Sequence, residues 1–299
     1  MPGGLTPETI AAYERDGAVL LTQPFESHWV DGLRAEVDRI LDRHDRGEPN
    51  HCFVTSSSGR AHINNMVLKE PFSRRWAVES PVGEIVARLI GSSTARFYLD
   101  VVFCKQGAGT EGRTVPHHDV AAFGFKGHHL PSFWMALTDV GEDNAPLCTA
   151  LGSHKRITHM FRSVASRAEL PVIAGYKPHE DVARFLDEHN FPTRVWTARK
   201  GDVVVVNPYC IHWSMPMLSS ERRIGFSTRW IGDDVRWQPN IYHEVEASTH
   251  PATLDAGSPP PDDWFPKVWD AGEGFVARAS GAFTKFVTVE PRPGYHKLS

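Results

Sequence analysis

The N-terminal third of the chain carries apolar residues at the three- and four-residue spacing of amphipathic helices. Thr6-Pro7-Glu8 combines a hydroxyl cap, a proline in the first turn and an acidic side chain, and Gly17 is a stop signal, so a helix is predicted between them. A strand is predicted over residues 18–21, and helices over residues 27–44 and 72–91. The polar, turn-rich segment 47–59 predicts a loop that could form a lid over an active site.

From residue 95 onward the pattern changes to short runs of aromatic and β-branched residues separated by turn signals, which is typical of strands. Strands are predicted over residues 96–104, 130–140, 147–151, 203–206 and 224–230. Helices followed by short strands indicate an α+β protein. Its body is expected to be a strand-rich barrel or sandwich, with the early helices bracing one face.

The length and this order of elements predict one domain over residues 1–299. Residues 1–95 are expected to form helical support and lid, and residues 96–233 the strand core, with an insertion over 155–195 that contains a short helix at 180–188. Residues 234–299 form a C-terminal extension. Its apolar cluster consists of Trp264, Phe265, Val268 and Trp269.

Composition narrows the choice of partners. The 32 basic and 36 acidic side chains nearly balance, so no field favours nucleic acid or an anionic membrane, and a small-molecule partner is expected. No apolar run approaches the roughly 18 residues that span a bilayer. The four cysteines are far apart, form no C-x-x-C pair and come without a secretory signal, which predicts reduced thiols in the cytoplasm. The sequence does not indicate an oligomeric state.

The strongest chemical signal is the segment Thr114-Val115-Pro116-His117-His118-Asp119-Val120. Side chains two apart on a strand share a face, so His117 and Asp119 can point into one pocket while His118 points away. Two imidazoles and one carboxylate on one face of Fe(II) leave positions for a co-substrate and O2. His212 is the candidate third ligand. A hydrogen-bonded surface pair is the alternative for the two neighbouring residues, because the chain contains sixteen histidines.

Several stretches together resemble the phytanoyl-CoA dioxygenase family of Fe(II)- and 2-oxoglutarate-dependent oxygenases. The matching stretches are Leu5–Leu21, His117-His118-Asp119, Trp134–Asp139 leading to Leu151-Gly152-Ser153-His154, and Gly201-Asp202 through His212-Trp213-Ser214 to Arg222-Arg223 and Arg229-Trp230. They span about three quarters of the chain in the family's order. The resemblance implies a double-stranded β-helix (jelly-roll, cupin-like) core with His117, Asp119 and His212 as the catalytic iron ligands.

The resemblance also implies a place for 2-oxoglutarate. Family members bind its distal carboxylate with an arginine eleven residues after the second histidine, and 223 − 212 = 11 selects Arg223 over Arg222. A serine two positions after that histidine assists, and Ser214 matches it. Bidentate binding of a carboxylate by a guanidinium agrees with this assignment, and Gly225 is expected to leave room for a ligand. The alternative for the two arginines is a solvated turn.

Trp134 matches a family tryptophan near the co-substrate, eighteen residues before Gly152 (152 − 134 = 18), although a core aromatic is an equal alternative. Phe123, Phe125 and Trp213 flank the metal motifs and could line a substrate pocket; core packing is the competing explanation. Asn64, Asn65 and Lys69 lie where relatives supply a further polar contact to 2-oxoglutarate. His118, His128, His129 and His154 are expected to be surface or structural residues.

The resemblance therefore implies an enzyme that hydroxylates, desaturates or cyclises at an unactivated C–H bond, coupled to decarboxylation of 2-oxoglutarate to succinate and CO2. Asp119 argues against halogenation, because related halogenases have a small residue there. Basic residues suited to coenzyme A phosphates are scattered, which favours a free small molecule such as a natural-product intermediate. Two alternatives remain: a zinc hydrolase using the same three residues, which leaves Arg223 and Ser214 unexplained, and a non-catalytic cupin-like binding protein.

Overall fold

The computed structural model describes residues 2–57, 59–107, 113–162, 174–238 and 254–276. The first helix, α1 (Pro7–Asp16), begins and ends as its caps predict. The Thr6 hydroxyl accepts a hydrogen bond from the Thr9 amide at 3.2 Å, and Gly17 adopts the left-handed conformation at φ 77°. A short 3₁₀ helix, η1 (Pro2–Gly4), precedes α1.

Four further helices follow within the first ninety residues: α2 (Ser27–Asp45), α3 (Met66–Lys69), α4 (Pro71–Glu79) and α5 (Val82–Ile90). The single helix predicted over 72–91 is wrong, because Ser80 is extended at ψ 164° and separates α4 from α5. Pro81 disfavours helical backbone in the residue before it, which accounts for the break.

The larger sheet contains nine strands among the described residues. Its main path runs β1 (Ala18–Leu21), β12 (Val203–Val206), β7 (Ser132–Ala136), β14 (Arg223–Ile231), β4 (Thr94–Lys105), β16 (Lys267–Asp270) and β17 (Gly274–Phe275). The hairpin of β2 (Phe53–Ser57) and β3 (Arg60–Asn64) joins it through β4. The loop predicted over 47–59 is therefore wrong in part, because residues 53–57 are a paired strand.

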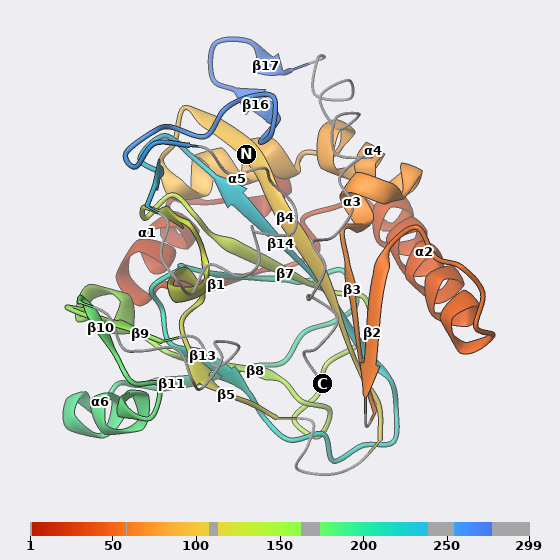
Figure 1. Cartoon of the computed structure of the whole chain (residues 1–299), viewed down its shortest axis with the longest axis horizontal. Coiled ribbons are helices and arrows are strands. Elements are labelled where there is room, and N and C mark those ends of the chain that lie inside the picture. The colour runs from red at the N-terminus through yellow and green to blue at the C-terminus, as the bar shows by residue number, and fades with distance from the viewer. Residues whose placement is uncertain (1, 58, 108–112, 163–173, 239–253, 277–299) are drawn as a thin grey trace.

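The smaller sheet has the order β11 (Thr193–Trp196), β8 (Leu147–Ala150), β13 (His212–Ser214) and β5 (Thr114–His117), all antiparallel. The remaining described strands are two residues long and form two separate pairs. These are β6 (Phe125–Lys126) with β15 (Arg236–Trp237), and β9 (Met160–Phe161) with β10 (Tyr176–Lys177). Figure 1 shows the small sheet lying apart from the large one, with α6 (Asp181–His189) beyond its edge.

The insertion expected over 155–195 contains α6 close to its predicted place, and residues 163–173 of it lie outside the described residues. Its end differs from the prediction, because β11 is part of the small sheet rather than of an insertion. Of the C-terminal extension, residues 239–253 and 277–299 lie outside the described residues; the apolar cluster supplies β16, which pairs with β4.

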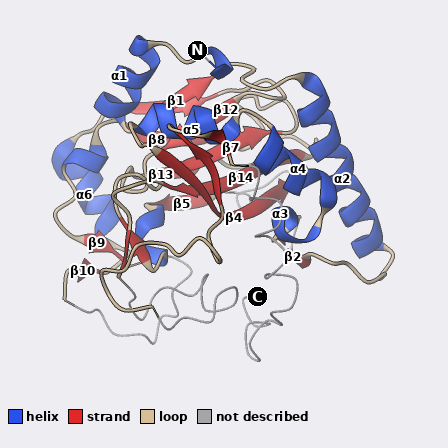
Figure 2. Cartoon of the chain, turned by 90° about the horizontal axis from the view of Figure 1, so that it is seen from above, coloured by secondary structure: helices blue, strands red, loops and turns tan. Residues whose placement is uncertain are grey.

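Alternation along the strands gives the large sheet two different faces. Phe133 and Met135 of β7 belong to the main hydrophobic core, which also contains the buried residues of helices α2, α4 and α5. Trp134 and Ala136 point the other way, into a second cluster. Figure 2 shows α2, α3 and α4 together on one side of the molecule, with α6 on the opposite side near β9 and β10. The second face is thus left for a site between the two sheets.

This arrangement is a double-stranded β-helix of the cupin-like type with bracing helices, so the predicted α+β fold class is confirmed. All four cysteines are buried and free. Within the described part of the chain, no helix is both long and apolar enough to cross a bilayer.

Candidate active site

Three side chains that could hold a metal ion meet at one end of the small sheet. His117 is the last residue of β5, His212 is the first residue of β13, and the register of these strands places the two opposite each other. Asp119 follows at the start of a short 3₁₀ helix, η3 (Asp119–Ala122). Its Oδ1 lies 3.7 Å from Nε2 of His117 and 3.6 Å from Nε2 of His212. One ligand atom from each residue therefore lies within 4.8 Å of the other two.

Backbone carbonyls orient both imidazoles. Nδ1 of His117 lies 2.8 Å from the Val115 carbonyl, and Nδ1 of His212 lies 3.0 Å from the Cys210 carbonyl. A carbonyl oxygen can only accept, so each Nδ1 carries the proton and each Nε2 presents a lone pair. Burial and the nearby His212 lower the pKa of His117 to about 4, which keeps this imidazole neutral at physiological pH. Two rings that direct their Nε2 atoms at one point fit a divalent transition metal.

Asp119 is held from the opposite side. Its Oδ2 accepts a 2.6 Å hydrogen bond from the Ser132 hydroxyl and a 3.0 Å ion-pair hydrogen bond from Arg229. Burial favours the protonated acid, but the charge of Arg229 and the hydrogen bond from Ser132 outweigh it and hold the pKa of Asp119 below its usual range. The carboxylate is therefore ionised, with one oxygen tethered and the other directed at the histidines. Two nitrogens and this free oxygen make a donor set suited to Fe(II).

The prediction that Asp119 shares a strand face with His117 is wrong in its geometry, although the side chains do converge. The strand ends at His117, and Asp119 begins a helical turn. His118 points elsewhere and is buried, where its Nε2 accepts a 2.8 Å hydrogen bond from the Phe161 amide. His118 is thus structural, as expected, and the cluster of described metal-ligating groups contains neither it nor His128.

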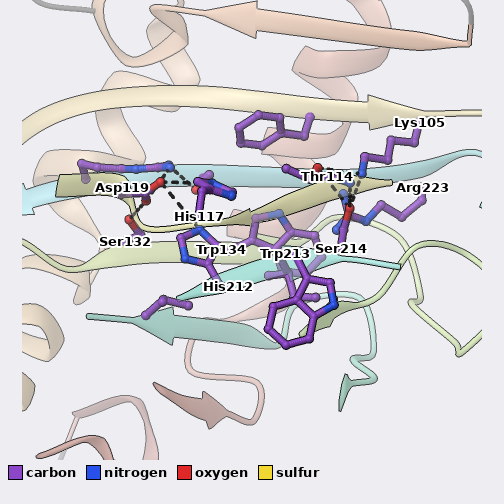
Figure 3. A pocket seen from close by; sticks show the side chains of 15 residues that line it. Lys105, Thr114, His117, Asp119, Ser132, Trp134, His212, Trp213, Ser214 and Arg223 are labelled. Atoms are coloured by element: carbon purple, nitrogen blue, oxygen red, sulfur yellow. Dashed lines mark hydrogen bonds and ion pairs between the residues drawn. The ribbon is translucent and has the colours of Figure 1, made fainter. Parts of the chain in front are cut away.

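The triad opens into a cavity of about 110 Å³ between the two sheets (Figure 3). Arg223, at the start of β14, lies in its wall and is 2 % exposed. Among the described residues its Nε has no hydrogen-bond partner. Burial lowers the pKa of Arg223 to about 10, so the guanidinium is still charged. A buried cation without a described carboxylate partner is unstable by itself, and the site fits an anion brought by a ligand.

Ser214 also lines this part of the cavity, and two donors occupy its oxygen. Oγ of Ser214 accepts from Nζ of Lys105 at 2.6 Å and from the Thr114 amide at 2.9 Å. Its own proton is left to donate, either to Oγ1 of Thr114 at 3.1 Å or to a bound ligand. Figure 3 shows this group of side chains separated from the metal-ligand group along the cavity.

Trp134 and Gly225 form the wall beside the guanidinium. Cζ of Arg223 lies 4.4 Å from the Trp134 ring centroid, a cation–π contact that fixes the arginine. A Cβ on Gly225 would lie 2.2 Å from the indole. The space predicted for a ligand at Gly225 is therefore occupied by Trp134, and that prediction is wrong.

Replacing Gly225 with alanine is expected to displace the indole and, with it, Arg223. We expect 2-oxoglutarate affinity to fall by about tenfold or more, because the arginine loses its stacking partner in a closely packed wall. Metal affinity should be unchanged, since His117 and His212 lie on the small sheet and Asp119 lies in the turn after it. Anaerobic titration measures both quantities; equal 2-oxoglutarate affinity in the variant would contradict this packing argument.

The three aromatic residues predicted to line a substrate pocket separate in the structure. Trp213 lines the cavity. Phe123 and Phe125 instead belong to a separate buried cluster, where the Tyr98 ring lies 5.5 Å and 5.6 Å from them. Core packing, the competing explanation, accounts for both phenylalanines, so the pocket assignment fails for them.

Sequence reasoning missed several polar residues of the cavity. Arg229 and Ser132 hold Asp119, and Lys105 and Thr114 contact Ser214. Arg229 stood in a stretch that resembles the family, and Lys105 ended a buried strand, which is an unusual place for a lysine. Neither signal indicates a role without the strand register. Asn64, Asn65 and Lys69 are absent from the described lining of this cavity.

A jelly-roll that presents two histidines from adjacent strands and one carboxylate from the turn that follows defines a mononuclear non-haem metal protein of the Fe(II) oxygenase type. Comparison with known proteins agrees with this class. The sequence model of phytanoyl-CoA dioxygenase (PhyH) matches residues 13–225, and the chain belongs to that family. Among curated proteins, Dioxygenase olcK of Penicillium canescens is 26 % identical over 152 residues, 47 % of this chain and 50 % of the relative. The chain thus aligns with about half the length of this relative.

Solved structures share the fold. The non-haem alpha-ketoglutarate-dependent carbocyclase SnoK from nogalamycin biosynthesis superposes with a TM-score of 0.68 at 20 % identity, covering 88 % of this chain and 96 % of SnoK. The epimerase SnoN in complex with Fe³⁺, alpha-ketoglutarate and nogalamycin RO gives 0.65 at 22 % identity, with 87 % and 97 % covered. EctD from S. alaskensis with 2-oxoglutarate and 5-hydroxyectoine gives 0.59 at 18 % identity, with 76 % of each chain covered.

Proposed function

We propose that this protein is an Fe(II)- and 2-oxoglutarate-dependent oxygenase that hydroxylates, desaturates or cyclises a small organic metabolite. One observation carries the proposal: a single cavity contains the His117, Asp119 and His212 donor set and, separately, a buried Arg223 without a described carboxylate partner. A metal alone needs only the first feature. A ligand that both chelates the metal and carries a distant carboxylate uses both.

Different residues of the cavity would bind the metal and the co-substrate. Nε2 of His117, Oδ1 of Asp119 and Nε2 of His212 would hold Fe(II), while Arg223 and Ser214 would bind the distal carboxylate of 2-oxoglutarate. Bound together, iron and 2-oxoglutarate supply O2 activation, with decarboxylation of the keto acid to succinate and CO2. Trp134 would keep the guanidinium in place, and the buried walls would exclude water from the reacting groups.

The two alternatives explain less of the cavity. A zinc hydrolase needs a metal-bound water and a base, and it gives no reason for an unpaired buried guanidinium. A binding protein without catalysis needs no ionised carboxylate held by Ser132 and Arg229. The carboxylate at Asp119 also argues against a halogenase, because halide binding to iron requires that ligand position to be free.

For the substrate we propose a free small molecule, such as an intermediate in natural-product biosynthesis. Two of the structural neighbours come from nogalamycin biosynthesis, and another was solved with 5-hydroxyectoine. Trp213 at the cavity wall offers an aromatic surface for such a molecule. We place the protein in the cytoplasm, in keeping with four buried, free cysteines.

The test is an anaerobic titration of the metal-free protein with Fe(II) and 2-oxoglutarate. We expect a weak visible charge-transfer band that saturates with one equivalent of each, because this band forms only when the keto acid chelates the iron. Iron binding without the band would reject the co-substrate and favour the hydrolase or the binding protein. After a positive result, succinate release identifies substrates.

A further inference from the structure

Lys105 is a second cation in the carboxylate-binding end of the cavity. It is the last residue of β4, where the strand register pairs it with Arg223 of β14 on one side and with Arg60 of β3 on the other. The side chain is buried, with the residue 6 % exposed, and it lines the cavity. Figure 3 shows Lys105 beside Arg223, Ser214 and Thr114.

The described partners of its ammonium group are neutral. Nζ of Lys105 donates to Oγ of Ser214 at 2.6 Å and to Oγ1 of Thr114 at 3.3 Å, and it forms no ion pair with a described carboxylate. A lysine nitrogen has three donors when charged, so one hydrogen is left for a ligand. Both hydroxyls come from the small sheet, on β13 and β5, while the lysine comes from the large one.

The charged and titratable groups that face Lys105 are mostly positive. Arg223 of β14 faces Lys105, and so do Arg60 and His62 of β3. The strands β5 and β13 contribute only the neutral side chains Thr114 and Ser214 at this end. The metal-ligating side chains of β5 and β13 lie at the other end of the cavity. Two adjacent cations in a buried site repel each other unless an anion lies between them. Arginine does not deprotonate in proteins, so Lys105 is the group that loses a proton and becomes neutral.

We propose that Lys105 binds the distal carboxylate of the dicarboxylate co-substrate together with Arg223, and that it takes up one proton from solvent when this carboxylate arrives. This inference rests on the proposed function, since it names 2-oxoglutarate as the ligand. It makes the pocket selective for a keto acid with a second carboxylate, and it makes co-substrate affinity dependent on pH.

Burial and the charges of Arg223 and Arg60 lower the pKa of Lys105 to about 6 in the free protein. The amine is then mostly neutral at physiological pH, and a bound carboxylate raises its pKa by favouring the charged form. Binding therefore consumes a proton above pH about 6, so the dissociation constant should rise as pH rises, by up to about tenfold per pH unit until the pKa of the complex is reached.

The first measurement uses the unaltered protein loaded with Fe(II) under argon. Titration calorimetry with 2-oxoglutarate near pH 7.5, in two buffers of different ionisation enthalpy, counts the protons exchanged, and we expect uptake of about one proton per site. Pyruvate is the matched ligand, because it chelates iron through the same keto-acid group but lacks the distal carboxylate. Its binding should be weaker and should consume no proton at Lys105.

The variant Lys105→Met keeps the length of the side chain and removes its charge. We expect its 2-oxoglutarate dissociation constant to rise by about tenfold or more near pH 6.5, proton uptake to vanish and the pH dependence to flatten, with Fe(II) affinity unchanged. Lys155→Met is the matched control, because Lys155 is an exposed residue of the short 3₁₀ helix η4 (Ser153–Lys155) and is absent from the described lining of the cavity. That variant should behave as the unaltered protein.

The outcomes separate this inference from the proposed function. If the unaltered protein forms no charge-transfer band with 2-oxoglutarate, the proposed function fails. If the band forms but no proton is taken up and Lys105→Met binds equally well, only the role of Lys105 is overturned. Equal proton uptake with pyruvate and 2-oxoglutarate would also overturn it, because the proton would then belong to another group.

Discussion

Replacing Asp119 with alanine is expected to abolish Fe(II)- and 2-oxoglutarate-dependent turnover while the fold is kept. The carboxylate supplies one of three ligand atoms, and two imidazoles alone hold Fe(II) weakly. The change also leaves Arg229 buried without its acidic partner, because the 3.0 Å pair between them is lost. We therefore expect a loss of about 3–5 kcal/mol in the free energy of unfolding. Succinate release measures the activity, and denaturant unfolding measures the stability.

A surface substitution shows whether the loss of activity and stability is specific to the position of Asp119. Asp31 forms a 2.6 Å pair with Lys200 at an exposed site, so Asp31→Ala removes an ion pair of the same charge type far from the cavity. Exposed pairs contribute about 0–1 kcal/mol, and this variant should keep full activity. Anaerobic Fe(II) titration of Asp119→Ala completes the test. Full iron affinity together with full turnover would remove the proposed metal site.

Replacing Arg223 with leucine is expected to raise the 2-oxoglutarate requirement by a large factor. The substitution removes a charge-assisted pair with a buried carboxylate, a loss on the order of 2–5 kcal/mol, which corresponds to roughly 30-fold to several thousand-fold in affinity. Trp134 also loses its cation–π partner at 4.4 Å, which adds to the effect. The KM for 2-oxoglutarate and the strength of the charge-transfer band measure it, while Fe(II) affinity should stay the same.

Arg222 is a close control for this experiment. It lies just before β14, where its Nε donates to Oε1 of Gln106 at 3.0 Å in an exposed position. Arg222→Leu removes the same functional group one position away and should leave the 2-oxoglutarate requirement within about twofold, because an exposed hydrogen bond contributes little. A large effect at Arg222 with none at Arg223 would mean that the wrong arginine was chosen.

The two sheets supply different parts of the cavity. The small sheet and the turn after it carry the metal-ligand candidates His117, Asp119 and His212. The large sheet carries Arg223 and Lys105 on neighbouring strands. Asp119 joins the two halves, because its outer oxygen is held by Ser132 and Arg229, which are paired residues on β7 and β14 of the large sheet. A shift between the sheets would therefore affect metal and co-substrate binding together.

Much of the fold follows from local pattern. The caps Thr6 and Gly17 bound α1, because a helix end needs partners for its free amides and carbonyls wherever it lies. Predictions failed where a local signal was weak or was misread. Part of the polar run over 47–59, residues 53–57, becomes strand β2 because its backbone pairs with β3. The helix predicted over 72–91 breaks because Pro81 restricts the backbone of Ser80.

The candidate site also contains some residues that the sequence predicted and others that only the tertiary structure identified. The spacing of His117 and Asp119 suggested a metal-binding pair, and the resemblance to the phytanoyl-CoA dioxygenase family added His212 and Arg223 through their positions in the chain. Whether a residue faces the cavity depends on pairing between segments far apart in sequence. Phe123 and Phe125 are apolar neighbours of the motif yet belong to the core, while Lys105 reaches the cavity because its strand pairs with β14 more than a hundred residues later. Motif spacing together with the family resemblance thus predicted the metal and co-substrate ligands, and strand register, which depends on the whole tertiary structure, decided which other side chains line the same cavity.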